Sequence, residues 1–146
     1  MKLQTAAGEI EWEETPEGIS AKGRLPREAE FFQDHFPLFP VLPGVMNLEI
    51  FKQIAEDFLR RKTAKLAGLW CLTHLSDVRF SVYLKPGEAW EGRLDFWAGQ
   101  NGLTRWKASL SSRGKVAAQA RFILEPMSSP NAFVEDPQGV ENAGPR

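Results

Sequence analysis

A change in the spacing of apolar residues divides the chain into two kinds of secondary structure. Between residues 44 and 62 the apolar side chains recur every three to four positions, which is typical of a helix with one buried face. The members of that face are Leu48, Ile50, Phe51, Ile54, Ala55, Phe58 and Leu59. After Gly68 the spacing falls to two, which indicates strands with one buried face. The pattern predicts one long helix and a series of strands.

Turn residues separate the predicted strands from one another. The strands are expected at about 9–14, 18–25, 78–84, 88–100, 106–110 and 116–124. Turns rich in Pro, Gly and Asn lie at 15–18, 86–87, 101–102 and 113–114. Strands joined in this way form an antiparallel sheet with one buried face, and the apolar helix can cover that face. The residues alone therefore predict an α+β fold, with the sheet wrapped on one helix.

Composition narrows the class of protein. A chain of 146 residues fits one domain, and 42% hydrophobic with 25% charged residues is ordinary globular usage. The net charge of -1 predicts neither nucleic-acid binding nor attraction to anionic membranes. No apolar run is long enough to cross a bilayer, and the first residues lack the apolar core of a signal peptide. We expect a protein without membrane insertion.

Cysteine and histidine usage bears on compartment and on metal binding. The single cysteine, Cys71, excludes an intrachain disulfide and fits a reducing cytoplasm. His35, His74 and Cys71 do not have the spacing of metal ligands, so we expect no metal site.

The last part of the chain differs in character from the rest. Residues 127–146 are rich in Pro, Asn, Gly and Ser and show no periodicity. We therefore expect a single domain at 1–126 and a flexible C-terminal tail at 127–146.

Candidate chemistry gathers just before and within the predicted helix. His35 lies in a loop with Pro37, Pro40 and Pro43, and Gly44 opens the helix. Glu49 and Gln53 are four residues apart and share one helical face. An imidazole and a carboxylate beside a helix N-terminus are suited to acid–base chemistry on a carbonyl compound, because free amide donors there favour negative charge.

Each of these residues also has a purely structural interpretation. His35 is then a loop residue bound to backbone, and Gly44 is a turn residue that allows close packing. Glu49 would belong to a solvated face, paired with Lys52 or Gln53. The residue types alone leave both interpretations open.

The same stretch resembles the signature FFxGHFPxxPxxPGVLxxEAxAQ of the 3-hydroxyacyl-[acyl-carrier-protein] dehydratases, the FabZ/FabA type of hotdog-fold protein. The matching positions are Phe31, Phe32, His35, Phe36, Pro37, Pro40, Pro43, Gly44, Val45, Glu49 and Gln53. Downstream, residues 77–80, 86–88, 102–107 and 114–116 are similar to the family's EARF, PGD, GLTRFK and DGKV segments. The resemblance spans about residues 8 to 125. It implies a hotdog fold, an antiparallel sheet wrapped around one long central helix.

The resemblance also implies a role for each candidate residue. His35 would remove the C2 proton of the substrate, and Glu49, entering from the partner subunit, would protonate the leaving 3-hydroxyl. Gln53 would orient Glu49, and the Gly44 N–H would donate to the thioester oxygen. No cofactor is implied. The residues expected to line the substrate channel are Phe36, Phe39, Pro43 and Val45.

The implied reaction is dehydration of a (3R)-hydroxyacyl thioester to a trans-2-enoyl thioester in fatty-acid, polyketide or aryl polyene-like biosynthesis. An acyl carrier protein would present the substrate, and the enzyme would be a homodimer or a trimer of dimers. Two alternatives remain, a hotdog acyl thioesterase and a non-catalytic hotdog subunit that binds an acyl carrier.

Several positions depart from the family pattern and leave the acyl chain length open. Near the histidine they are Asp34, Leu38 and Phe39; on the helix they are Asn47, Ile50, Phe51 and Lys52. By proximity Lys52 could hold Glu49 ionised and hinder its work as an acid. We expect Lys52 to point to solvent instead.

Overall fold

The computed structural model describes residues 1–28, 41–62 and 70–127. Its strands are β1 (Lys2–Thr5), β2 (Gly8–Thr15), β3 (Gly18–Arg24), β4 (Trp70–Phe80), β5 (Ala89–Ala98), β6 (Thr104–Ser112) and β7 (Lys115–Pro126). The helix α2 (Gly44–Lys62) precedes β4, and a short 3-10 helix, η2 (Gln100–Gly102), joins β5 to β6. The predicted tail beyond residue 127 lies outside the described residues.

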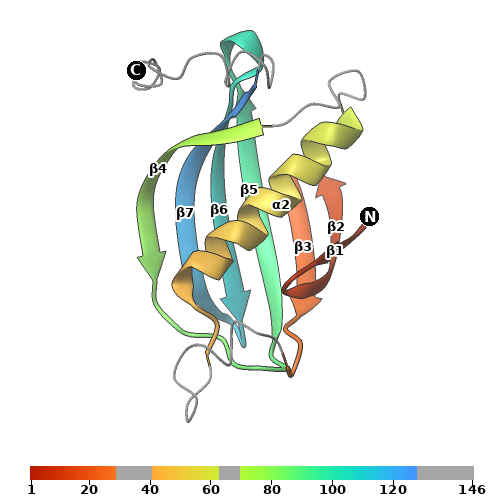
Figure 1. Ribbon diagram of the computed structural model, residues 1–146, viewed down its shortest axis with the longest axis vertical. Helices are drawn as coiled ribbons and strands as arrows, with labels where there is room; N and C mark the ends of the chain where they lie inside the picture. Colours follow the sequence, from red (N-terminus) through yellow and green to blue (C-terminus); the bar gives the residue numbers. More distant parts are fainter. Residues whose placement is uncertain (29–40, 63–69, 128–146) are drawn as a thin grey trace, which may run out of the picture.

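The strands form one antiparallel sheet in the order β1-β2-β3-β5-β6-β7-β4. Figure 1 shows the sheet curving around α2, which crosses its inner face diagonally. The N-terminal end of α2 lies near the end of β4, and its C-terminal end lies over the β1–β3 side. The prediction of a hotdog fold is confirmed.

The core fills the space between α2 and the inner face of the sheet. Phe58 of α2 makes edge-to-face contacts with Trp12, Phe96 and Trp106, with ring centroids 4.9 to 6.0 Å apart. Aromatic pairs in this geometry stabilise a core beyond the burial of their area. The apolar stripe read from the sequence is thus the buried face of the helix.

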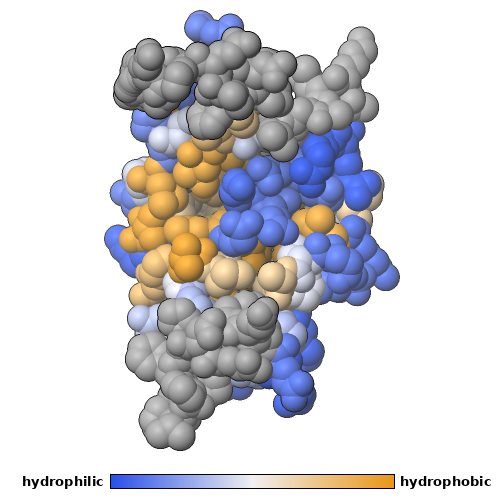
Figure 2. All heavy atoms as spheres, in the orientation of Figure 1, coloured by the Kyte–Doolittle hydropathy of each residue, from blue (hydrophilic) through white to orange (hydrophobic). Residues whose placement is uncertain are grey.

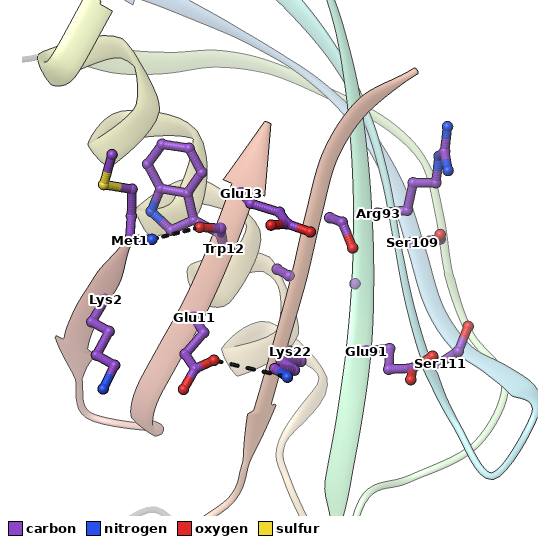
Figure 3. Close-up of a pocket in the computed structure, with 13 residues that line it drawn as sticks. Met1, Lys2, Glu11, Trp12, Glu13, Lys22, Glu91, Arg93, Ser109 and Ser111 are labelled. Atoms are coloured by element: carbon purple, nitrogen blue, oxygen red, sulfur yellow. Dashed lines mark hydrogen bonds and ion pairs between the residues drawn. The ribbon is translucent and has the colours of Figure 1, made fainter. Parts of the chain in front are cut away.

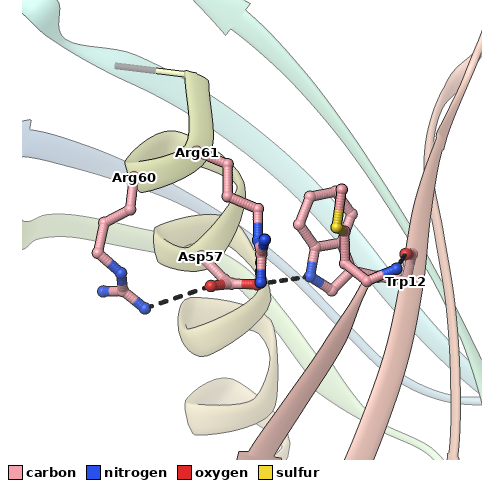
Figure 4. Close-up of polar contacts among 5 residues, drawn as sticks. Trp12, Asp57, Arg60 and Arg61 are labelled. Atoms are coloured by element: carbon pink, nitrogen blue, oxygen red, sulfur yellow. Dashed lines mark hydrogen bonds and ion pairs between the residues drawn. The ribbon is translucent and has the colours of Figure 1, made fainter. Parts of the chain in front are cut away.

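A buried carboxylate ties the last turns of α2 to β2 (Figure 4). Asp57 Oδ2 accepts hydrogen bonds from Trp12 Nε1 at 2.8 Å and from Arg61 Nε at 3.1 Å, and Asp57 Oδ1 lies 3.7 Å from Arg60 Nη2. Buried charged groups are tolerated when they are paired and hydrogen-bonded in this way. Asp57 follows the buried Ile54 by three positions, so it lies on the buried side of α2.

The predicted strand at 78–84 is only partly present, because β4 begins earlier and ends at Phe80. A register shift between Ser76 and Arg79 and a left-handed Asp77 (φ 53°) mark a bulge in β4. The N–H groups of Ser81 and Val82 then both point at the carbonyl of Ala117, so the regular ladder ends there.

Two further expectations need correction. The sequence pattern did not predict β1, which pairs with β2 along the edge of the sheet. Sheet periodicity also predicts Trp97 in the core, together with Trp70, Trp90 and Trp106, but Trp97 is 52% exposed because its neighbour Phe96 takes the inward position on β5. Trp70, Trp90 and Trp106 are buried as predicted.

Candidate active site

The start of α2 is fixed from both sides by backbone contacts. The N–H of Leu42 donates to the carbonyl of Leu84 at 2.7 Å, and the N–H of Met46 donates to the carbonyl of Pro43 at 2.9 Å. Leu42 and Leu84 are both fully buried, which anchors the chain just before Gly44. The first N–H groups of a helix lack intrahelical acceptors, so this end of α2 is a fixed place for developing negative charge.

Gly44 is required by a close contact with β4. A Cβ atom at this position would lie 2.7 Å from Cε2 of Phe80, closer than real Cβ contacts allow. Phe80 belongs to the segment that resembles the family's EARF strand. The structural interpretation of Gly44 therefore holds, and it is compatible with a role for the Gly44 N–H toward a ligand.

Glu49 and Gln53 meet on the side of α2 that faces away from the core. Gln53 Nε2 donates a hydrogen bond to Glu49 Oε2 at 2.8 Å, and both side chains are partly exposed. This contact fixes one carboxylate oxygen, and within residues 1–28, 41–62 and 70–127 the other oxygen has no recorded hydrogen bond. It is the geometry that an orienting Gln53 requires; the catalytic roles of both residues remain predictions.

Lys52 does not point freely to solvent, contrary to our expectation. Its Nζ lies 3.6 Å from Glu56 Oε2, and the two side chains are 32% and 17% exposed. The ammonium group therefore has a defined partner on the same face of α2 that carries Glu49.

Asn47 is a polar residue that sequence reasoning did not place in the site. Its side chain is buried, and Nδ2 donates to the carbonyl of Gly44 at 3.3 Å. Oδ1 of Asn47 has no hydrogen-bond partner among the described residues. The signal was present in the sequence, since Asn47 departs from an apolar position of the family pattern.

The remaining predicted site residues divide between described and undescribed segments. Pro43 is partly buried, and Val45 has a side chain that is 66% exposed beside Gly44. His35, Phe36 and Phe39 lie outside the described residues. The structure thus brings together Gly44, Val45, Glu49 and Gln53, on the first turns of one helix.

A separate groove of about 570 Å³ lies on the outer face of the sheet, away from α2 (Figure 3). Its charged lining mixes both signs, with Glu11, Glu13 and Glu91 facing Lys22 and Arg93. Lys22 Nζ lies 3.9 Å from Glu11 Oε1, and both side chains are largely exposed. None of the candidate site residues in the described part of the chain contributes to this groove, so we do not assign the chemistry to it.

In residues 1–28, 41–62 and 70–127, no group of three or more His, Cys, Asp or Glu side chains could hold a metal ion. No helix in these ranges has the length and the apolarity needed to cross a bilayer.

The sequence is similar to those of known dehydratases. The ApeI-like family model, described as ApeI dehydratase, matches residues 11–121. The 3-hydroxyacyl-[acyl-carrier-protein] dehydratase FabZ of Acinetobacter baylyi is 27% identical over 106 residues, covering 70% of this chain and 72% of the relative. FabZ of Klebsiella pneumoniae is 34% identical over 95 residues. That alignment covers 64% of this chain and 63% of the relative, so the match spans less than two thirds of that relative.

Solved structures show the same fold. The dehydratase heterocomplex ApeI:P from Xenorhabdus doucetiae superposes with a TM-score of 0.57 and 23% identity, covering 78% of this chain and 93% of that chain. A probable thioesterase from Bartonella henselae gives a TM-score of 0.59 with 14% identity, covering 74% and 90%. At these identities the likeness concerns the fold alone.

Proposed function

The chain belongs to the ApeI-like dehydratase family, and from that premise we propose that it dehydrates a (3R)-hydroxyacyl thioester to the trans-2-enoyl thioester. The observation that carries the proposal is the start of α2. There Gly44, Glu49 and Gln53 stand in the register of the dehydratase signature, and Gln53 Nε2 holds Glu49 Oε2 at 2.8 Å.

In the proposed chemistry one residue removes a proton from the substrate and a second residue supplies a proton to the leaving group. His35 takes the proton from C2, alpha to the thioester carbonyl, and the electron pair moves toward the carbonyl oxygen. The Gly44 N–H, at the N-terminus of α2, stabilises the negative charge on that oxygen. The pair then forms the C2–C3 double bond while the C3–O bond breaks. Glu49 supplies the proton with which the hydroxyl leaves as water.

The substrate we propose is carried by an acyl carrier protein, as in the names of the FabZ relatives. The pathway is fatty-acid synthesis or a related polyketide or aryl polyene-like route, in the cytoplasm. We propose Pro43 and Val45 as part of the acyl channel, because they flank Gly44 and Val45 is exposed.

We propose a homodimer in which β4 meets a second copy of the chain. β4 is the last strand of the sheet, so one of its edges carries backbone groups that another strand can pair with. Exposed apolar side chains gather on and just after this strand: Leu75, Val78, Phe80, Val82 and Tyr83. Figure 2 shows apolar surface on the β4 side of the face that α2 crosses and polar surface on the opposite side.

A patch of this kind commonly marks a protein interface. The second copy is favoured as occupant because the edge and the patch are continuous with the end of β4 that packs on Gly44. In such a dimer Glu49 of one chain completes the site that His35 of the other begins. A trimer of dimers is the larger assembly that we propose to test beside the dimer.

Incubation with short-chain thioesters tests the proposed reaction. With 3-hydroxybutyryl and crotonyl thioesters, a dehydratase interconverts the two and changes the enoyl absorbance without releasing thiol. A thioesterase releases free thiol, and a non-catalytic subunit does neither; either result would overturn the proposal. His35→Ala and Glu49→Gln serve as controls, each expected to lose about 100-fold or more of the activity with an unchanged circular dichroism spectrum.

A further inference from the structure

Lys52 presents a chemical problem for the proposed reaction. An ammonium group favours the ionised form of a nearby carboxyl, and Glu49 must carry a proton when the hydroxyl leaves. Glu49 lies three positions before Lys52, and Glu56 lies four positions after it. Side chains at both spacings are neighbours on a helix, so either carboxylate is within reach of the ammonium.

In the structure, Lys52 and Glu49 have different partners. Lys52 Nζ lies 3.6 Å from Glu56 Oε2, whereas Oε2 of Glu49 accepts the Gln53 amide at 2.8 Å. With side chains 32% and 17% exposed, the Lys52–Glu56 pair is screened less by water than the Lys22–Glu11 pair, whose side chains are 71% and 47% exposed.

The strands beside α2 present mainly apolar groups to this end of the helix. Phe80 of β4 packs on Gly44, and Leu75 of β4 lies in register with the buried Phe122 of β7. On the outer face, Asp77 of β4 pairs with Arg121 of β7 at 3.3 Å. The other charged or titratable residues of these two strands are Cys71, His74, Arg79, Lys115 and Glu125. All but Lys115 take outer-face register positions, and exposed Lys115 lies at the start of β7.

The remaining charged groups near this part of α2 lie on other elements or further along the helix. Lys2 of β1 is exposed, and Asp57, Arg60 and Arg61 form their own cluster toward the C-terminal end of α2. The role proposed for His35 makes it the other titratable group of the reaction. Among the described residues, Lys52 is therefore the cation that shares the helical face and spacing needed to reach Glu49.

We propose that Glu56 is a positioning residue that holds the Lys52 ammonium away from Glu49 and so keeps Glu49 able to carry the proton that the reaction needs. The inference rests on the proposed function. It also explains why a lysine is tolerated here, since in the family signature that position is alanine.

The variant Glu56→Gln removes the competing carboxylate and frees Lys52 to approach Glu49. The nearby ammonium then stabilises the Glu49 carboxylate, which opposes delivery of a proton from Glu49 to the leaving hydroxyl. We expect kcat for dehydration to fall about 3- to 10-fold near pH 7.5, with KM unchanged. A fall of this size corresponds to a displacement of the pH profile by about half to one pH unit. The pH at which kcat begins to decline should move toward acid by the same amount.

The double variant Lys52→Met/Glu56→Gln separates this effect from a structural one. If Glu56 acts through Lys52, the double variant recovers kcat and the pH profile to within about two-fold of wild type. Glu11→Gln, which breaks an exposed pair on the outer face, is the matched control and leaves the profile unchanged. A readout independent of turnover is the carbon-13 titration of the Glu49 carboxyl, assigned with Glu49→Gln.

Two results would overturn the inference. One is a Glu56→Gln variant with a wild-type pH profile and an unchanged Glu49 titration, in an enzyme that Glu49→Gln inactivates. The other is a double variant as impaired as Glu56→Gln alone. A wild-type protein without dehydratase activity would instead refute the proposed function, and the Glu49 titration would still show whether Glu56 controls Lys52.

Discussion

At the scale of single residues, the start of α2 is held by specific side-chain contacts. Asn47 turns its amide onto the carbonyl of Gly44, and Gln53 turns its amide onto Glu49. Gly44 itself lies under the ring of Phe80, with no space for a side chain. The helix N-terminus and the carboxylate are thus held by contacts within the described part of the chain.

We predict that Gly44→Ala destabilises the protein by about 1–3 kcal/mol, because the new methyl group overlaps the Phe80 ring. Activity should fall with it, since the Gly44 N–H would move. Urea unfolding of Gly44→Ala, Phe80→Ala and the double variant measures the coupling between the two sites. In the Phe80→Ala background the alanine at 44 should cost much less; an equal cost in both backgrounds would show that the ring contact is not the cause.

At the scale of elements, the position of α2 on the sheet is set by the aromatic core and by the Asp57 cluster. Trp12 takes part in both, through its ring contact with Phe58 and its N–H bond to Asp57. Because Glu49 lies on the same rigid helix, a shift of the C-terminal turns would also move the carboxylate.

We predict that Trp12→Phe lowers the free energy of unfolding by about 1–3 kcal/mol, because Asp57 loses a buried donor. Chemical denaturation at neutral pH measures this loss. Lys22→Ala, which removes an exposed ion pair on the neighbouring strand, is the control and should change stability by less than about 1 kcal/mol. Equal effects from the two variants would contradict the importance of the Asp57 link.

A second carboxylate joins the turn before β5 to the end of β6. Glu88 accepts hydrogen bonds from the Lys85 N–H at 2.9 Å and from Ser112 Oγ at 2.6 Å. Burial alone would raise the pKa of Glu88, but the bond from Ser112, the Lys85 N–H and the charges of Arg113 and Lys85 together lower it below its usual 4.5.

A carboxyl with a lowered pKa in the folded state stabilises the fold above its unfolded pKa and loses that contribution as pH falls through the folded value. We therefore predict that stability falls below about pH 4.5 partly through Glu88, and that Ser112→Ala makes this decline shallower. Thermal unfolding of both proteins between pH 3 and 7 is the measurement. Parallel curves for the two proteins would exclude the contribution of the Ser112 bond.

Prediction from sequence succeeded where one apolar period continues along a whole element. The helix at 44–62 and the hairpin of β2 and β3 follow the apolar pattern, because burial of one face dictates it. The end of β4 did not, because the bulge at Asp77 shifts the chain out of the ladder while the alternation continues through Val82. Spacing along the helix puts both Glu49 and Glu56 within reach of Lys52. Only the side-chain geometry shows that Lys52 pairs with Glu56.

At the scale of the whole molecule, the sheet ends in two different edges. β1 is short and carries Lys2 and Gln4 on its exposed side, whereas β4 is long and lies beside a run of exposed apolar side chains. Charged, short edges discourage pairing between sheets, and long apolar edges favour it. This asymmetry supports assembly through β4, with one copy of the chain supplying part of the site of the other.

The central claim is a dehydratase site shared between two copies of the chain, with His35 from one and Glu49 from the other. Mixing inactive His35→Ala chains with inactive Glu49→Gln chains, under conditions that exchange subunits, tests it most directly. Under random pairing half of the dimers are mixed and each carries one intact site of two, so hydration of a crotonyl thioester should recover to about a quarter of the wild-type rate. Subunit exchange confirmed by mass spectrometry with no recovered activity, or an active monomer, would contradict the shared site.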